Sequence, residues 1–296
     1  MSTLLHLLKE ANIPLSLFCE KLKITEDRAL EIAHTADDDT QMLIYMQFVT
    51  DESLFSELLN FYTPFVKDKV ELAAFISSVL CLTNNNIPRR MLNSIHRLVT
   101  LADAMEQVRP GKDSLKIFFF VVCIETLYHL RDGDVANKTL AVIDFFDNFI
   151  EAADKQIILD RFQRSLGDER YRVSRLDHES AAKYAKRMRN LKRMSTQISM
   201  DIFARIVNEI RNCFAHEGDY WKFNFAKNDD TSMLNSLIVA ENQEEDRLKR
   251  KGITQGLRRV YEVDLTYEQF KAACVRGFLQ FVKAYSKNFV HSSIDR

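Results

Sequence analysis

Residues 118–130 have the sequence FFFVVCIETLYHL, in which a single acid, Glu125, interrupts an apolar run. This pattern contains no glycine or proline, and it predicts a largely buried helix at about residues 113–131. The segment Ile117–Ile124 is the longest apolar run of the chain, at eight residues, and about 20 are needed to span a bilayer. The stretch therefore indicates a helical core and no membrane span.

Composition extends this prediction to the whole chain. The 296 residues include only 7 glycines and 4 prolines, whereas average usage gives roughly 20 and 15. Few tight turns are therefore expected. We predict an all-α protein made of a helical bundle, with at most one short strand or hairpin near the C-terminus, where residues 261–265 alternate. The 46% hydrophobic content excludes wholesale disorder and fibrous structure.

The scarce turn formers also mark a domain boundary. Pro110 and Gly111 are adjacent, and they divide the chain into a helical N-terminal domain, 1–108, and a second helical domain, 109–296. We expect the first to have a sensing, regulatory or interaction role. Its apolar spacing predicts several short amphipathic helices, with 40–49 and 52–66 as separate ones.

The second domain is expected to contain four long helices and one special insertion. The helices lie at about 113–131, 134–165, 196–217 and 267–289, and Thr266 caps the last one. The insertion, at about 166–193, is polar and basic.

Charge is distributed unevenly along the chain. The total is −1, which excludes a uniformly basic nucleic-acid binder, but residues 161–193 carry eleven Lys/Arg and four Asp/Glu. This stretch is a candidate for contact with an RNA backbone, and a solvated helix face is the alternative. The candidate RNA-binding residues are Arg170, Arg172, Arg175, Lys183, Lys186, Arg187, Arg189, Lys192 and Arg193.

The five cysteines are widely spaced and form no CxxC pair. Neither a disulfide framework nor a zinc cluster is predicted, so we expect a cytoplasmic protein with no metal and no cofactor. The N-terminal sequence has neither the basic region nor the cleavage site of a leader.

Residues 209–218, EIRNCFAHEG, have the residue types needed for phosphodiester chemistry. Asn212 and His216 are four apart and share one helix face, and the long side chain of Arg211 reaches the same space. A histidine transfers protons near neutral pH, and an arginine stabilises the charge of a phosphorane. The alternative is a helix-end histidine with a surface hydrogen bond and an arginine in an ordinary salt bridge.

Arg211-Asn212-x-x-x-His216, at the end of a late helix, resembles the R-x(4–6)-H motif of the HEPN superfamily. The upstream helix with Glu125 inside an apolar run is similar to that family as well. The resemblance covers roughly residues 111–290. It implies that His216 is the acid–base residue, Arg211 the phosphate stabiliser and Asn212 the orienting residue, with Glu125 as an ion-pair partner that holds Arg211.

Family membership would imply a homodimer in which the motif-bearing helices meet and form one metal-independent ribonuclease site. Many members are toxins or antiviral and abortive-infection effectors, so RNA is the expected substrate, and an antitoxin or regulatory protein is a possible partner. Two alternatives remain. One is a non-catalytic helical adaptor that binds RNA, nucleotide or a partner protein. The weaker one is a DNA-binding regulator acting through residues 15–33, where acidic residues argue against it.

Overall fold

The computed structural model describes residues 2–22, 24–82, 85–134, 137–164, 180–183, 185–186, 197–212, 215, 223–227, 232–237 and 258–290. The chain divides into two compact units, Met1–Leu92 and Asn93–Arg296. The division lies inside helix α6 (Ile87–Val108), whereas the predicted boundary at 108/109 is the end of that helix. Gly111 follows it with a φ of 70°, a left-handed conformation that suits glycine.

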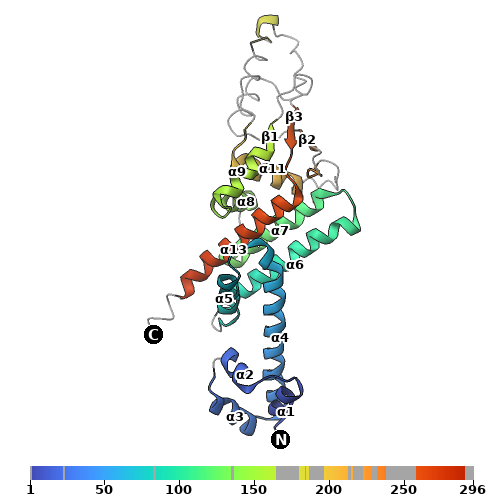
Figure 1. Ribbon diagram of the computed structural model, residues 1–296. Helices are drawn as coiled ribbons and strands as arrows, with labels where there is room; N and C mark the ends of the chain where they lie inside the picture. The colour runs from blue at the N-terminus through green and yellow to red at the C-terminus, as the bar shows by residue number, and fades with distance from the viewer. Residues whose placement is uncertain are drawn as a thin grey trace. The chain divides into compact units, whose positions relative to one another are not determined.

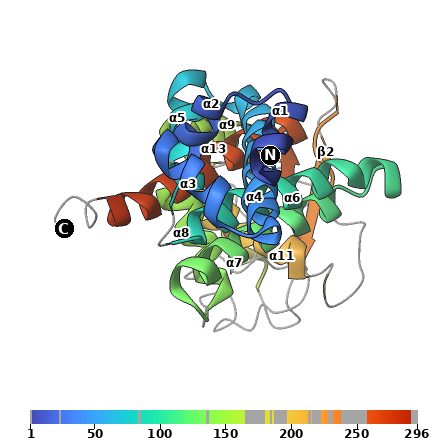
Figure 2. The same ribbon diagram turned by 90° about the horizontal axis from the view of Figure 1, so that it is seen from below.

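The first unit consists of helices, as predicted (Figure 1). Helices α1, α2 and α3 gather around the N-terminal part of α4, as Figure 2 shows from below. One apolar cluster joins these four helices; its members are Leu4, Leu8, Phe18, Cys19, Ala29, Ala33 and Phe48. The elements are α1 (Thr3–Glu10), α2 (Leu15–Leu22), α3 (Glu26–Thr35), α4 (Asp38–Tyr62), the 3-10 turn η1 (Thr63–Phe65) and α5 (Lys69–Leu80).

Helix α4 differs from its prediction. The expected separate helices at 40–49 and 52–66 form one continuous helix of 25 residues, because Thr50 and Asp51 between them do not break a helix. The Asp37 side chain caps its start by accepting a hydrogen bond from the Thr40 amide. The buried side chain of Gln41 then joins α4 to its neighbours, since it accepts from the Leu4 amide and donates to the Ala36 carbonyl.

The second unit is also built mainly from helices, so the predicted all-α class is confirmed. The prediction of one helix at 134–165 is wrong, because two separate helices, α8 and α9, lie in this range. Asn137 caps α8 through the Leu140 amide, α8 ends at Asn148, and a new helix starts four residues later. The helices here are α7 (Asp113–Asp132), α8 (Lys138–Asn148), α9 (Ala152–Arg161), α11 (Met200–Asn212) and α13 (Tyr267–Val290).

A small antiparallel sheet lies beside these helices. Its strand order is β1-β3-β2, with β1 (Phe162–Arg164), β2 (Ser232–Leu237) and β3 (Arg258–Val263). The strand predicted at 261–265 corresponds to β3, whose pairing with β2 sets Ser232 opposite Val263. At most one strand or hairpin was expected, so the third strand, β1, is an addition that the sequence did not predict. It pairs with β3 and sets Phe162 opposite Val263.

Phenylalanine rings connect this sheet to the helices. Phe162 of β1 packs on Phe203 of α11, with ring centroids 5.2 Å apart, and Phe203 contacts Phe146 of α8 at 5.3 Å. All three rings are buried. Aromatic contacts of this kind fix the position of α11, the helix that ends with Arg211 and Asn212.

Helix α13 approaches α8 closely at Gly277. A Cβ atom at this position would lie 2.8 Å from Ile150 Cδ1 and 3.0 Å from Phe145 Cζ. The predicted cap of this helix is confirmed, because Thr266 Oγ1 accepts from the Gln269 amide at 3.3 Å. No helix in the described ranges is both long enough and apolar enough to cross a membrane.

The start of α7 contains a buried cluster of charges. Asp113, 1% exposed, accepts a hydrogen bond from the Phe225 amide at 2.8 Å and lies 2.9 Å from Lys116 Nζ. Lys116 also donates to Glu106 of α6 at 2.7 Å, and its ammonium lies 4.7 Å from the ring centre of Tyr267. Burial lowers the pKa of Lys116, but the two carboxylates outweigh it and the pKa is raised overall.

Candidate functional site

Helix α11 brings Arg211 and Asn212 to the middle of α7. Its buried face packs on α7 and α8 through residues that include Phe203, Ile206 and Ile210. Arg211 and Asn212 form the last turn of the helix as the structure describes it. They lie beside Glu125, which is 86 positions earlier in the chain.

The guanidinium of Arg211 is held by two neighbours. Its Nη2 donates a hydrogen bond to Glu125 Oε2 at 2.9 Å and lies 2.8 Å from Oε1, at an angle that makes no second hydrogen bond. Its Nη1 donates to Asn212 Oδ1 at 3.0 Å. The ion pair between Glu125 and Arg211 that the family resemblance implies is thus present, and Asn212 contacts the arginine as well.

One nitrogen of this guanidinium has no hydrogen-bond partner among the described residues. Arg211 Nε is buried and makes no hydrogen bond among the described residues. The side chains of Arg211 and Glu125 are 13% and 14% exposed, so the charges are mostly covered. A buried N–H group without an acceptor costs free energy, and such groups are uncommon in proteins unless a ligand or water completes them.

A second cation lies at the edge of the same carboxylate. Lys138, the first residue of α8, has its Nζ 3.6 Å from Glu125 Oε2, and its side chain is 59% exposed. The ion pair is long and mostly in water, so it contributes little to stability. Glu125 therefore has two cations beside it, one mostly buried and one mostly exposed.

A hydrogen bond joins α11 to α8 next to these charges. The buried Asn208 donates from Nδ2 to Thr139 Oγ1 at 3.1 Å, one turn before Asn212. Sequence reasoning identified neither these two residues nor Lys138. Lys138 and Thr139 lie about 70 positions before the end of α11, so no sequence spacing connects them to it. Asn208, in contrast, lies on the same face of α11 as Asn212.

The remaining predicted residues are only partly placed. His216 lies outside the described residues, as does Cys213, so the distance from His216 to Arg211 stays a prediction. Of the basic stretch, Lys183 and Lys186 are exposed and helical. The other candidate RNA-binding residues lie outside the described part of the chain; they are Arg170, Arg172, Arg175, Arg187, Arg189, Lys192 and Arg193.

Comparison of the chain with protein-family models, with curated proteins and with solved structures finds no match. The geometry around Arg211 is therefore the basis on which a function can be inferred. A fixed guanidinium whose Nε–H has no acceptor among the described residues, an adjacent amide and an exposed lysine can bind an anion and stabilise added negative charge on it.

Proposed function

We propose that the protein is a metal-independent endoribonuclease of the HEPN type, which acts as a toxin or an abortive-infection, antiphage effector. In this proposal the ribose 2′-oxygen attacks the neighbouring phosphorus, the 5′-oxygen leaves, and the product carries a 2′,3′-cyclic phosphate. His216 transfers the proton of the 2′-hydroxyl or of the leaving oxygen. Arg211 stabilises the charge on the phosphorane, and Asn212 orients the arginine.

The observation that carries the proposal is the state of Arg211. Its guanidinium is fixed by Glu125 and Asn212, and its Nε–H has no acceptor among the described residues. A phosphate oxygen is a suitable acceptor for that group, because charge-assisted hydrogen bonds to phosphate are short and strong. A preorganised donor stabilises a transition state without having to reorganise during the reaction.

The proposal includes a homodimer. One chain supplies one Arg211 and one His216, whereas cleavage needs one group to accept a proton and another to donate one. Two copies of the motif in one site would supply both. Analytical ultracentrifugation tests this part, and a protein that is active and monomeric would contradict it.

The burial of Arg211 favours a second candidate function, a non-catalytic helical adaptor. A guanidinium that is 13% exposed and paired with a carboxylate also occurs as a structural link between two helices. The adaptor would bind RNA, nucleotide or a partner protein through other surfaces of the same fold. Arg211 would then contribute to stability and not to chemistry.

One experiment separates the two functions. Purified wild-type protein, the variant His216→Ala and the variant Arg211→Lys are incubated with total RNA in EDTA, and the 3′ ends of the products are analysed. We expect cyclic-phosphate ends from the wild type, none from His216→Ala, and strongly reduced cleavage by Arg211→Lys, because lysine lacks the Nε–H and the planar fork.

The matched control is His129→Ala, which removes an exposed histidine of α7 four residues after Glu125. It should cleave RNA like the wild type. Equal RNA decay in wild type and His216→Ala, or no decay in either, would reject the catalytic function and leave the adaptor.

A further inference from the structure

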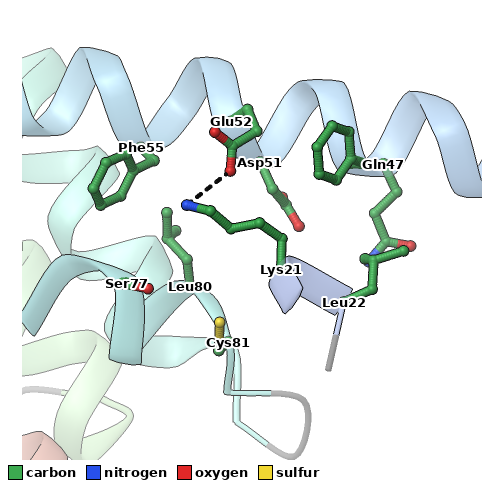
Figure 3. Close-up of a pocket in the computed structure, with 10 residues that line it drawn as sticks. Lys21, Leu22, Gln47, Asp51, Glu52, Phe55, Ser77, Leu80 and Cys81 are labelled. Carbon is green, nitrogen blue, oxygen red and sulfur yellow. Dashed lines mark ion pairs between the residues drawn. The ribbon is translucent and has the colours of Figure 1, made fainter. Parts of the chain in front are cut away.

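The first unit contains a pocket that the proposed ribonuclease function does not use. It has a volume of about 470 Å³, which is within the range of small-molecule sites. Helices α2, α4 and α5 supply its walls (Figure 3). The lining combines apolar and polar side chains, and it consists of Lys21, Leu22, Gln47, Phe48, Asp51, Glu52, Phe55, Ser77, Leu80 and Cys81.

The side chain of Lys21 extends across this pocket toward α4 (Figure 3). Its ammonium lies 3.1 Å from Glu52 Oε1 and 4.9 Å from the ring centre of Phe55. A carboxylate and an aromatic face together make a favourable environment for an ammonium ion. The pocket therefore has a cation site, and a side chain of the chain itself occupies it.

Lys21 is a weakly held occupant. Its side chain is 31% exposed and that of Glu52 is 37% exposed, and ion pairs at this exposure add little stability because water screens them. The lysine also loses conformational entropy when its four-carbon stem is held in one position. An external ammonium can therefore displace it at little cost.

The second carboxylate of the pocket is already neutralised. Asp51 accepts a hydrogen bond from Arg89 Nη2 at 2.5 Å, and Arg89 does not line the pocket. When Lys21 moves into solvent, Glu52 becomes the carboxylate that needs a cation. An anionic ligand would have to approach both Asp51 and Glu52, so the charge of the lining favours a positively charged one.

We propose that this pocket binds a small organic cation with a primary ammonium group on an apolar or aromatic body. The ammonium takes the position of the Lys21 Nζ between Glu52 and Phe55. The body lies against the apolar part of the lining, which Leu22 and Leu80 form with the phenylalanines. This site is independent of Arg211 and of RNA cleavage, so either proposal can fail without the other.

Three probes of similar size test the ligand class on the full chain: 2-phenylethylammonium, the neutral 2-phenylethanol and the anionic 3-phenylpropanoate. Ligand-observed NMR titration measures the affinities. We expect the ammonium to bind best by about threefold or more, from its contacts with Glu52 and Phe55. Equal binding of the alcohol, better binding of the carboxylate, or no binding of any probe at millimolar concentration overturns the proposal.

Two variants should change the affinity for the ammonium in opposite directions. Lys21→Met keeps the apolar stem but removes the competing charge, so binding becomes tighter by about threefold. Glu52→Gln removes the acceptor of the ammonium, so binding becomes weaker by a similar factor. Shifts in the same direction, or no shifts, contradict the model in which Lys21 occupies the cation site.

Controls and a local readout complete the test. Glu20→Gln and Lys67→Gln remove exposed charges of the same unit that do not line the pocket, and they should leave the affinity unchanged. Thermal unfolding confirms that all variants fold. The ammonium should also slow maleimide labelling of the partly exposed Cys81, followed by peptide mass spectrometry, and unchanged labelling would place the binding elsewhere.

Discussion

The two charged clusters along α7 each leave one carboxylate oxygen, Asp113 Oδ1 or Glu125 Oε1, without a hydrogen bond but 2.9 or 2.8 Å from a cation. They differ in whether a buried donor also lacks an acceptor. At the start of the helix, Lys116 lies between two carboxylates and against the ring of Tyr267, and Asp113 also accepts from the Phe225 amide. Farther along, Glu125 pairs with Arg211, whose Nε has no partner among the described residues.

This difference distinguishes a cluster with a structural role from a cluster that is a candidate binding site. The first cluster joins α6 and α7 to the segment 223–227, and among the described residues its buried side-chain atom without a hydrogen bond is an acceptor, Asp113 Oδ1. The second cluster joins α7 to α11, and Arg211 Nε–H in it has no acceptor among the described residues. A buried N–H donor without an acceptor costs stability, so its presence in the second cluster points to a ligand that completes it.

The largest expected effect comes from breaking the first cluster. Lys116→Met leaves the Asp113 carboxylate buried without its cation, and we expect the free energy of unfolding to fall by about 3–5 kcal/mol. Urea denaturation measures this loss.

The double variant Asp113→Asn, Lys116→Met is the matched control. It removes both charges and keeps an acceptor for the Phe225 amide, so it should lose much less stability than the single variant. A loss below about 1 kcal/mol for Lys116→Met alone would show that this cluster is not a structural link.

The second cluster should respond differently to the same treatment. Replacing both partners, Glu125→Leu with Arg211→Met, removes two covered charges and the unsatisfied Nε, so stability should stay unchanged or rise by about 1–4 kcal/mol. RNA cleavage should be lost. Denaturation and cleavage assays on the same preparation measure the two effects. A strongly destabilised double variant would show that both clusters have a structural role.

Local patterns predicted the helical class, the C-terminal helix with its Thr266 cap, and strand β3. Contacts that depend on distant residues were not predictable in this way. Strand β1 exists because Phe162 pairs opposite Val263, about 100 positions later. The break between α8 and α9 also lacks a local cause, because residues 149–151 include neither glycine nor proline.

The candidate site shows the same limit. Arg211 and Asn212 were identified from their spacing to His216, but the pairing with Glu125 was expected only from a family resemblance. Nothing local relates two residues 86 positions apart. Lys138 was missed because a lysine at a helix start is ordinary, and only the packing of α7, α8 and α11 brings it to the same carboxylate.

A smaller effect concerns pH. The hydrogen bond from Lys116 lowers the pKa of the Glu106 carboxyl below its ordinary value of 4.5, although burial partly opposes this shift. The ionised form is therefore favoured in the folded state, so its contribution to stability is present above about pH 4.5 and is lost as the pH falls through the lowered pKa. Thermal unfolding between pH 7 and 3 should show a shallower acid-side decline for Glu106→Gln than for the wild type, and equal slopes would contradict this assignment.

Replacing Lys138 should have the smallest effect on stability, but it should change the salt dependence of RNA binding. Its side chain is 59% exposed and its ion pair with Glu125 is long, so Lys138→Gln should change the free energy of unfolding by less than about 0.5 kcal/mol. If the lysine turns from Glu125 to a phosphate when RNA binds, the slope of log affinity against log salt concentration should decrease by about 0.7 to 1. Lys287→Gln, which removes an exposed lysine of α13, should leave that slope unchanged. Equal slopes for both variants would mean that RNA does not contact Lys138 at the edge of the Glu125–Arg211 cluster. The second cluster would then no longer differ from the first as a candidate binding site.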